Sequence, residues 1–388
     1  MSSVARTLVD RAHKRPGLRL GTVNDQLRLD EALTLAAGRA ERLLDSGVAP
    51  GDRVALVAST STDYLLTWMA CVLAGTPVAL VNPTYPRDLL AEMLRRLDPA
   101  VVIAQEHLAD ARTSGSADPA GLPGLGAASL DTVSYMHTSG TSGPPKFCVQ
   151  TNEYFRRLAA AMGAALELTP ADRVLAPLPL FHINPMGYGI LTALYAGADA
   201  LAVEKFSASR FWPDAVRQGV TALVLHAPPV EILKRATTAE DAAGHRIRTM
   251  FYADGAFLER FSVPAAVSGY GSTEAAGVTH LRRWSVTDHL PPDGMAAPLA
   301  RTSNGASTAT SRFGSESASG AHCSAATSPR TGSTPPGMPR TGSTRAISAA
   351  STPTVTWCSW NAARNRSVSE ESSSPSRLSR ATSRASRD

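Results

Sequence analysis

The chain has 388 residues, of which 43% are hydrophobic, so it is long enough for two or more domains with a sizeable core. Its formal net charge is +5, but residues 1–300 carry 27 Lys and Arg against 29 Asp and Glu, whereas residues 301–388 carry 11 Arg, no Lys and 4 acidic residues. The body is therefore close to neutral, and the basic balance, which alone would suggest an acidic partner, belongs to the C-terminal segment.

The first hundred residues alternate helical and strand signals. The stretch "DEALTLAAGRAERLLDSG" has apolar residues at helical spacing, an acidic start and a glycine stop. The predicted elements, in chain order, are a helix over 30–47, a strand over 52–58, a helix over 62–74, a strand over 77–82, a helix over 86–98 and a strand over 100–105. This alternation predicts an α/β layered fold with a mainly parallel sheet.

The pattern resumes after a Gly/Pro/Ser-rich connection over 113–129. The later predicted elements are helix 154–166, strand 173–182, helix 187–198, strand 199–204, helix 207–219, strand 220–227 and strands 249–255 and 265–271, each of the last two leading into a loop. The longest uncharged stretch, 65–81, approaches membrane length, but Gly75 and Pro77 divide it, so it predicts a buried helix followed by a buried strand and no membrane span.

The cysteines and the N-terminus indicate a cytoplasmic setting. Cys71, Cys148, Cys323 and Cys358 lie far apart with no metal-binding spacing, so neither structural disulfides nor a metal cluster is expected. The N-terminal stretch "MSSVARTLVDRAHKR" lacks the apolar run of a signal peptide.

The stretch "HTSGTSGPPK", 137–146, predicts a phosphate-binding loop. Glycines allow backbone N–H groups to turn inward, hydroxyls donate hydrogen bonds and the closing lysine adds a positive charge. It is neither a Walker A loop nor a nucleophile elbow, because the spacing of its glycines, lysine and serines fits neither pattern. Such clusters are more often plain surface turns, so the loop needs a second feature to carry a functional interpretation.

That second feature is "SGYGSTEAAG", 268–277, which follows a predicted strand. An aromatic ring there can stack on a base, a threonine can donate to phosphate, and a carboxylate can hold Mg²⁺ between phosphate oxygens. Both loops follow α/β units, so both are expected at carboxyl ends of strands, where such folds bind ligands.

Taken together, these motifs resemble those of the adenylate-forming acyl-CoA synthetases, which include luciferase and peptide-synthetase adenylation relatives. The resemblance covers about 25–301 and rests on "HTSGTSGPPK", "YGSTE", "APLPLFHIN" (176–184), "VNPTYP" (81–86) and "SGVAPGDRVAL" (46–56), in that family's order. The run "LFHINPMGYG" further suggests the small-acid or carnitine-type (crotonobetaine-like) ligases.

The resemblance implies a role for each matching residue. The residues that would cradle the ATP phosphates are Thr138, Ser139, Gly140, Thr141, Ser142, Gly143 and Lys146. Tyr270, with Gly271, would stack on adenine, and Thr273 would touch the α-phosphate. Glu274, with Thr141, would hold Mg²⁺.

Two further stretches match the family with one departure. His182 would sit between the acid's carboxylate and the nucleotide, although beside Phe181 it equally fits a buried core histidine. Asp254, Gly255 and Ala256 occupy the place of the family's Gly-Gly-Ala adenine loop, and Asp254 departs from that pattern. The implied reaction activates a carboxylic acid with ATP to an acyl-adenylate and transfers the acyl group to CoA, with His182, Lys146 and Thr273 as the catalytic residues.

The segment 302–388 lacks the rest of this machinery. It is rich in Ser and Arg without helical or strand periodicity, contains no Lys and no "TGD" turn, and is expected to be disordered. Read with a one-base slip, Gly342–Ser348 permits W-F-D-T-G-D-L, and Trp357–Cys358 and Trp360–Asn361 force Val and Glu. We therefore interpret 1–301 as an incomplete N-terminal adenylation domain and 302–388 as out-of-frame translation. A Ser/Arg-rich tail that binds nucleic acid is the rival interpretation.

The sequence thus predicts an acid–CoA ligase using ATP, Mg²⁺ and CoA, inactive as written for want of the lysine-bearing domain. The alternative is a non-catalytic nucleotide- or acyl-binding remnant. Carboxylic acid and CoA are the expected partners, nucleic acid is not, and the sequence does not indicate the acid's length or the oligomeric state.

Overall fold

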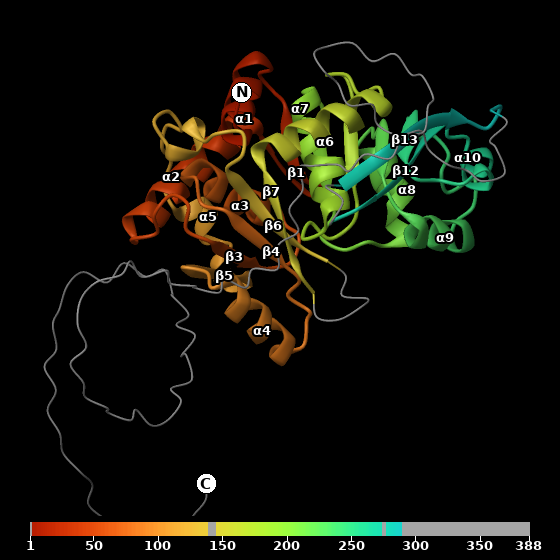
Figure 1. Ribbon diagram of the computed structural model, residues 1–388. Helices are drawn as coiled ribbons and strands as arrows, with labels where there is room; N and C mark the ends of the chain where they lie inside the picture. The colour runs from red at the N-terminus through yellow and green to blue at the C-terminus, as the bar shows by residue number, and fades with distance from the viewer. Residues whose placement is uncertain (1, 139–144, 274–276, 289–388) are drawn as a thin grey trace, which may run out of the picture. The chain divides into compact units, whose positions relative to one another are not determined.

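Two β-sheets organise the computed structural model, which describes residues 2–138, 145–273 and 277–288 (Figure 1). The smaller sheet has the strand order β5-β3-β4-β6-β7. Its strands are β3 (Val54–Val57), β4 (Val78–Val81), β5 (Val101–Ala104), β6 (Thr132–His137) and β7 (Phe147–Thr151). All neighbours are parallel except β6 and β7, which confirms the predicted, mainly parallel arrangement.

The larger sheet has the order β13-β12-β11-β10-β8-β9-β1-β2. Its strands are β1 (Arg19–Thr22), β2 (Asp25–Arg28), β8 (Arg173–Ala176), β9 (Asp199–Ala202), β10 (Ala222–Val224), β11 (Thr249–Phe251), β12 (Ala265–Ser272) and β13 (Gly277–Ser285). Its interior is parallel, and only the pairs at its two edges, β1–β2 and β12–β13, are antiparallel. The sequence predicted β8, β9, β10, β11 and β12, and it missed β1, β2 and β13, so neither edge hairpin was predicted.

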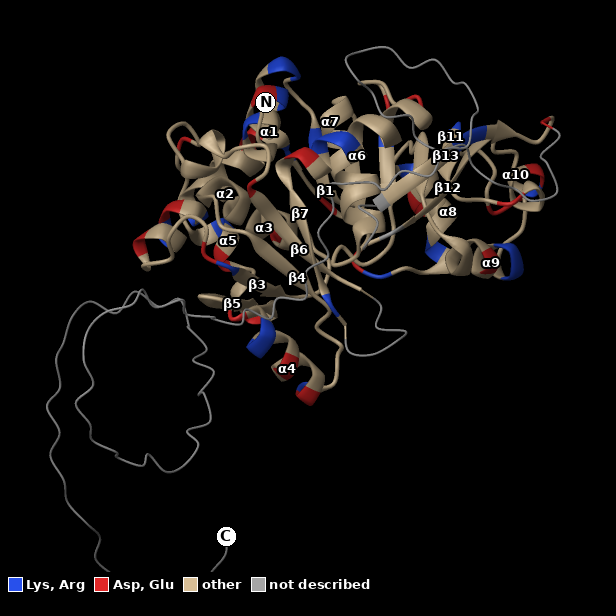
Figure 2. Ribbon diagram, in the orientation of Figure 1, with Lys and Arg blue, Asp and Glu red and all other residues tan. Residues whose placement is uncertain are grey.

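Helices pack against both sheets. They are α1 (Val4–Lys14), α2 (Leu29–Asp45), α3 (Thr62–Ala74), α4 (Arg87–Leu97), α5 (Asp110–Thr113), α6 (Asn152–Ala165), α7 (Thr192–Ala196), α8 (Ala208–Arg217), α9 (Ala227–Ala236) and α10 (Gly255–Phe261), with 3₁₀ turns at Gln105–His107 and Pro123–Gly126 and a π-helix, η3, at Asn184–Leu191. In Figure 2 most charged residues lie on helices and loops, and a few lie on strands of the larger sheet; the five strands of the smaller sheet contain none, in keeping with their burial.

Helix α3 shows why the uncharged stretch folds as a helix and a strand. Ser61 Oγ accepts a hydrogen bond from Tyr64 N at its start, and Gly75 ends it in the left-handed region with φ 71°. The helix is buried on every side, and β4 follows after Pro77. Among the described residues no helix is both long and apolar enough to span a membrane.

The predicted connection over 113–129 is a tightly packed segment. A Cβ on Gly38 of α2 would lie 2.3 Å from the Gly115 carbonyl oxygen. A Cβ on Gly124 would lie 1.9 Å from the Val72 carbonyl oxygen of α3. The segment therefore docks on two helices through glycines that leave no room for a side chain.

The predicted strand over 173–182 was too long. Strand β8 ends at Ala176, because Pro177 and Pro179 cannot donate to a sheet ladder. The next helix begins earlier than predicted, as the π-helix η3, and its Gly189 is so close to β8 that a Cβ would lie 2.5 Å from Ala176 Cβ. Asn184 Nδ2 ties the start of η3 to the Leu225 carbonyl after β10, at 3.1 Å.

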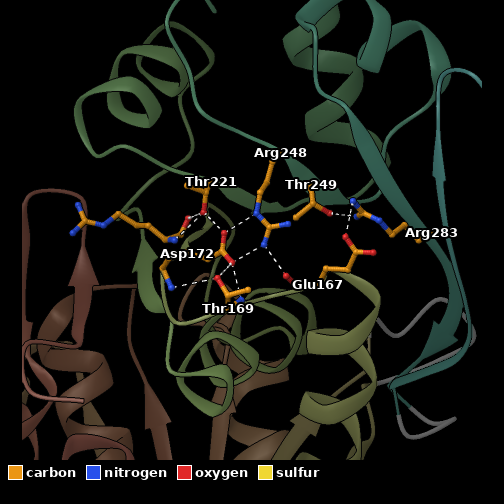
Figure 3. Close-up of polar contacts among 9 residues, drawn as sticks. Glu167, Thr169, Asp172, Thr221, Arg248, Thr249 and Arg283 are labelled. Carbon is orange, nitrogen blue, oxygen red and sulfur yellow. Dashed lines mark hydrogen bonds and ion pairs between the residues drawn. The ribbon is translucent and has the colours of Figure 1, made fainter. Parts of the chain in front are cut away.

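A polar network joins the amino ends of the strands of the larger sheet (Figure 3). Asp172, just before β8, accepts hydrogen bonds from Arg248 (2.6 and 2.9 Å), Thr221 Oγ1 (2.7 Å) and Thr169 N (2.7 Å). Burial alone would raise the pKa of this carboxyl, but these donors outweigh it and lower the pKa to about 2. Arg283 of β13 contacts Glu167 at 3.0 Å, which adds the edge strand to the network.

Candidate active site

A cluster of aromatic rings lies where carboxyl ends of strands from both sheets meet. His137 ends β6, Tyr85 follows β4, and Phe181 and His182 follow β8. The His137 ring lies 5.2 Å from Tyr85, 6.0 Å from Phe181 and 5.8 Å from His182 between centroids, and Phe181 lies 4.7 Å from His182. We call these four residues the ring cluster. It brings the His182 stretch beside the end of β6, the strand that leads into the predicted phosphate loop.

His137 is the most enclosed member of the ring cluster, with 3% of the residue exposed. Its Nδ1 lies 3.1 Å from the Tyr85 hydroxyl and 3.2 Å from the Thr138 carbonyl oxygen. Its Nε2 is buried and has no hydrogen-bond partner among the described residues. Burial lowers the pKa of the His137 imidazole and raises the pKa of the Tyr85 phenol. Both side chains are therefore neutral at pH about 7.

His182 is an exposed residue whose imidazole is nonetheless poorly solvated. The surrounding protein, together with His137 and His226, lowers its pKa to about 4. His226 follows β10 and is the N-cap residue of α9, without a side-chain capping hydrogen bond, so it adds the end of a fourth strand to those of β4, β6 and β8. A neutral His182 can contact a carboxylate or a phosphate only through a hydrogen bond, without an ionic charge.

The two ends of the predicted phosphate loop are held together. Thr138 N donates to the Lys146 carbonyl at 2.9 Å, and Lys146 N donates to Thr138 Oγ1 at 3.1 Å. Thr138 is buried and the Lys146 side chain is exposed. Ser139, Gly140, Thr141, Ser142 and Gly143 lie outside the described residues, so the structure places the base of this loop and not its interior.

Asp254 has two partners of its own. Its Oδ1 accepts from Phe257 N at 2.8 Å, which caps α10, and its Oδ2 lies 2.6 Å from Lys234 Nζ of α9. Burial alone would raise the pKa of Asp254, but the hydrogen bonds from Lys234 and from Phe257 N outweigh it and lower that pKa. Gly255 and Ala256 form the exposed first turn of α10. The departure from glycine at 254 therefore has a structural explanation.

Tyr270 stands near the end of β12 with 68% of the residue exposed. Its ring lies 6.1 Å from His280 of β13, at a β-bulge between Tyr270 and Gly271. Gly271 is exposed and Thr273 is half-buried just beyond the strand. Glu274 lies outside the described residues. A large exposed aromatic ring at a strand end is a surface on which a planar ligand can stack.

A separate cavity of about 590 Å³ shares no residue with the ring cluster. It lies among α1, α2 and residues 116–120, and both polar and apolar side chains line it, including Arg6, His13, Asp30 and Asp118. None of the predicted site residues contributes to it, so size alone does not locate the chemistry here.

Comparison with known proteins identifies the class. The profile of the AMP-binding enzyme family matches residues 26–303, and the chain belongs to that family. It is 29% identical over 308 residues to the medium/long-chain-fatty-acid–CoA ligase FadD6 of Mycobacterium tuberculosis, covering 70% of this chain and 51% of that protein. It is 28% identical to the oxalate–CoA ligase of Arabidopsis thaliana, covering 54% of this chain and 47% of that protein. The chain spans about half the length of these curated relatives.

Solved structures share the fold. The N-terminal domain of FACL13 from Mycobacterium tuberculosis superposes with a TM-score of 0.66 at 20% identity, covering 72% of this chain and 78% of that one. ATP-bound MatB from Rhodopseudomonas palustris has a TM-score of 0.60 at 20% identity, covering 76% and 63%. The α/β fold expected from the sequence is therefore the N-terminal-domain fold of acyl-CoA ligases.

Proposed function

We propose that residues 1–301 form the adenylation part of an acid–CoA ligase. The observation that carries this proposal is the ring cluster, because it brings the base of the predicted phosphate loop against the predicted acid-contacting histidine. Thr138 and His137 are consecutive, and the His137 ring lies 5.8 Å from the His182 ring. A nucleotide phosphate held above Thr138 and an acid held beside His182 would thus be neighbours, which converts a bimolecular step into a proximity-driven one.

In the proposed reaction a carboxylate oxygen of the acid attacks the α-phosphorus of ATP. The bond to the bridging oxygen breaks, pyrophosphate leaves and an acyl-adenylate remains. The thiolate of CoA then attacks the acyl carbon and AMP leaves. The loop 138–146 would bind the phosphates through its backbone N–H groups and Lys146, and Thr273 would contact the α-phosphate.

The remaining residues supply recognition. Tyr270 would stack on adenine, and the stretch 254–256 would lie along its edge. Mg²⁺ would neutralise phosphate charge when bound. Its proposed ligands Thr141 and Glu274 lie outside the described residues, and the described residues contain no cluster of three or more His, Cys, Asp or Glu suited to a metal. The proposed ligase acts in the cytoplasm.

Binding of ATP·Mg²⁺ tests the nucleotide half of the proposal. We expect saturable heat of binding with the full chain, and Tyr270→Ala should weaken it about tenfold or more, because stacking on a base is worth ~1–3 kcal/mol. The control is Leu130→Ala, which removes an apolar side chain that is 78% exposed and lies just before β6 of the smaller sheet. No heat with the unaltered chain would mean an inert remnant, and equal weakening in both variants would remove the role given to Tyr270.

We further propose that the chain as written does not complete the reaction. Its last 87 residues, 302–388, hold no lysine to stabilise the pentavalent phosphorus, and they lie outside the described residues. An assay of AMP release with ATP, CoA and a panel of short, medium and long carboxylic acids should show no turnover. AMP release that saturates with one acid contradicts this proposal. Nucleotide binding without turnover is the result that the non-catalytic alternative also predicts.

The out-of-frame interpretation has its own test. Resequencing the gene from the codon of Pro298 to that of Asn361 decides between a misread base and a decayed gene. If one base is added or lost there, the corrected chain should contain the "TGD" turn and a downstream lysine, and it should show the turnover that the chain as written lacks.

A further inference from the structure

Within the ring cluster, His137 has a buried atom that nothing in the described part of the chain satisfies. The residue is 3% exposed, yet its Nε2 has no hydrogen-bond partner among the described residues. A buried donor or acceptor left without a partner costs about 1–3 kcal/mol. Such an atom at the carboxyl end of a parallel strand, next to a predicted substrate contact, points to a ligand that completes it.

The ring of His137 is held in place on its other sides. Tyr85 Oη lies 3.1 Å from Nδ1, and the Phe181 ring stacks on the imidazole with centroids 6.0 Å apart and planes 27° from parallel. Tyr85 comes from the loop after β4 and Phe181 from the loop after β8, so the imidazole is clamped between the two sheets. Its Nε2 direction is consequently fixed before any ligand arrives.

Nδ1 has two neighbours that favour opposite tautomers. The neutral Tyr85 phenol, 3.1 Å away, can donate a hydrogen bond to Nδ1, whereas the Thr138 carbonyl oxygen, 3.2 Å away, can only accept one from an N–H at Nδ1. The Tyr85 contact is the shorter of the two, and it favours a proton on Nε2. If Nδ1 accepts that proton's hydrogen bond, the imidazole proton of the neutral ring resides on Nε2. The unsatisfied atom is then a donor, and donors are completed by carboxylate, phosphate or carbonyl oxygens.

We propose that His137 is a second substrate-contacting histidine, whose Nε2–H donates to the carboxylate of the acid beside His182. The inference rests on the proposed ligase function and deepens it. A neutral donor binds one carboxylate oxygen without placing a full positive charge next to it, so the other oxygen keeps its electron density for attack on phosphorus. Two neutral imidazoles 5.8 Å apart also present no cation that would capture an unrelated anion.

The test measures acid binding in the full chain saturated with the Mg²⁺ complex of α,β-methylene-ATP, which cannot be cleaved at the α-phosphorus. Butanoate, octanoate and hexadecanoate are the probes. His137→Phe keeps the ring stacking and removes Nε2, and it should weaken the tightest-binding acid about tenfold, as expected for a lost charge-assisted hydrogen bond of ~1.5–3 kcal/mol. His137→Gln returns an N–H near the Nε2 position and should restore most of that loss. Both variants should bind the nucleotide analogue as the unaltered chain does.

A second measurement keeps the test decisive if His137→Phe folds poorly. Nitrogen NMR of imidazole-labelled unaltered protein should show His137 protonated on Nε2, and its Nε2 signal should move with octanoate but not with octan-1-ol. An immobile signal overturns the inference, as does octanoate binding that His137→Phe leaves unchanged. A chain that binds the nucleotide but none of the acids overturns this inference and leaves the nucleotide site standing. A chain that binds neither overturns the proposed function as well.

Discussion

Asp172→Ala is expected to lower the free energy of unfolding by about 3 kcal/mol, the scale for breaking a largely buried ion pair and its hydrogen bonds. The Asp172 side chain is 4% exposed and accepts from Arg248, Thr221 and Thr169 (Figure 3). The variant leaves these donors beside a methyl group. Because they hold the starts of β8, β10 and β11, the loss should appear in the midpoint of urea unfolding.

The same carboxyl predicts a pH dependence. Its pKa in the folded protein is about 2, below the ordinary value of 3.8. The lowered pKa contributes ~2 kcal/mol of stability. That stability is fully present above pH about 4 and is lost as the pH falls toward about 2. The difference between the unaltered chain and Asp172→Ala should therefore narrow over that acid range and stay constant at higher pH.

The matched control for Asp172 is Asp98→Asn. Asp98 pairs with Arg53 at 3.3 Å, but its side chain is 87% exposed, and asparagine tolerates its positive φ of 49°. This control should cost less than about 1 kcal/mol. If the two substitutions destabilise equally, burial of the Asp172 network is not what gives it strength.

Gly124→Ala is expected to cost about 3 kcal/mol, at the upper end for overpacking. Its Cβ would stand 1.9 Å from the Val72 carbonyl oxygen and 2.8 Å from that of Leu73, and backbone atoms inside α3 cannot move aside without breaking the helix. Gly126→Ala, in the same 3₁₀ turn, adds its methyl where no atom lies within 4 Å and should be nearly neutral. Thermal unfolding of the two variants side by side makes the comparison.

Gly38→Ala extends that prediction to the other helix. A Cβ there would lie 2.3 Å from the Gly115 carbonyl oxygen, so it should destabilise the chain in the same way as Gly124→Ala. If neither Gly38→Ala nor Gly124→Ala lowers the unfolding temperature, the close packing of residues 113–129 on α2 and α3 does not contribute to stability. The segment would then be the loose connection that its composition suggests.

Local signals predicted much of the fold. Helix α3 was predicted over 62–74, which are its observed bounds; Gly75, used in the prediction, ends it, and Ser61, which the prediction did not use, caps its start. Helix α9 was missed although Pro228 and Pro229 in its first turn are a helix-start signal, since the apolar "VTALVLHA" was read through to Ala227 as strand. The hairpin β12–β13 was missed because pairing between strands depends on partners that propensity does not encode. Helix α1 was examined only as a possible leader, although Ser3 caps it.

The candidate site was predictable where the signal lies in one short stretch. The loop 138–146, Tyr270 and His182 were predicted in that way. In the structure Thr138 follows β6, Lys146 precedes β7, Tyr270 lies near the end of β12, and His182 lies in the loop after β8. Tyr85, His137 and His226 were given no role because their significance arises only from the approach of three separate strand ends. Tyr85 follows the predicted strand 77–82 and His226 lies near the end of the predicted strand 220–227, a position that could have singled them out, whereas no strand was predicted before His137.

The ring cluster also makes the two sheets one thermodynamic unit for any ligand that it binds. Tyr85 and His137 belong to the smaller sheet, while Phe181 and His182 belong to the larger one. A ligand that contacts all four residues binds only when both sheets are folded, so its binding free energy stabilises the two sheets together. A substitution at the amino ends of the strands of the larger sheet, such as Asp172→Ala, would then lower the apparent affinity for the ligand although it does not contact the ligand. A saturating concentration of ligand would make the two sheets unfold together.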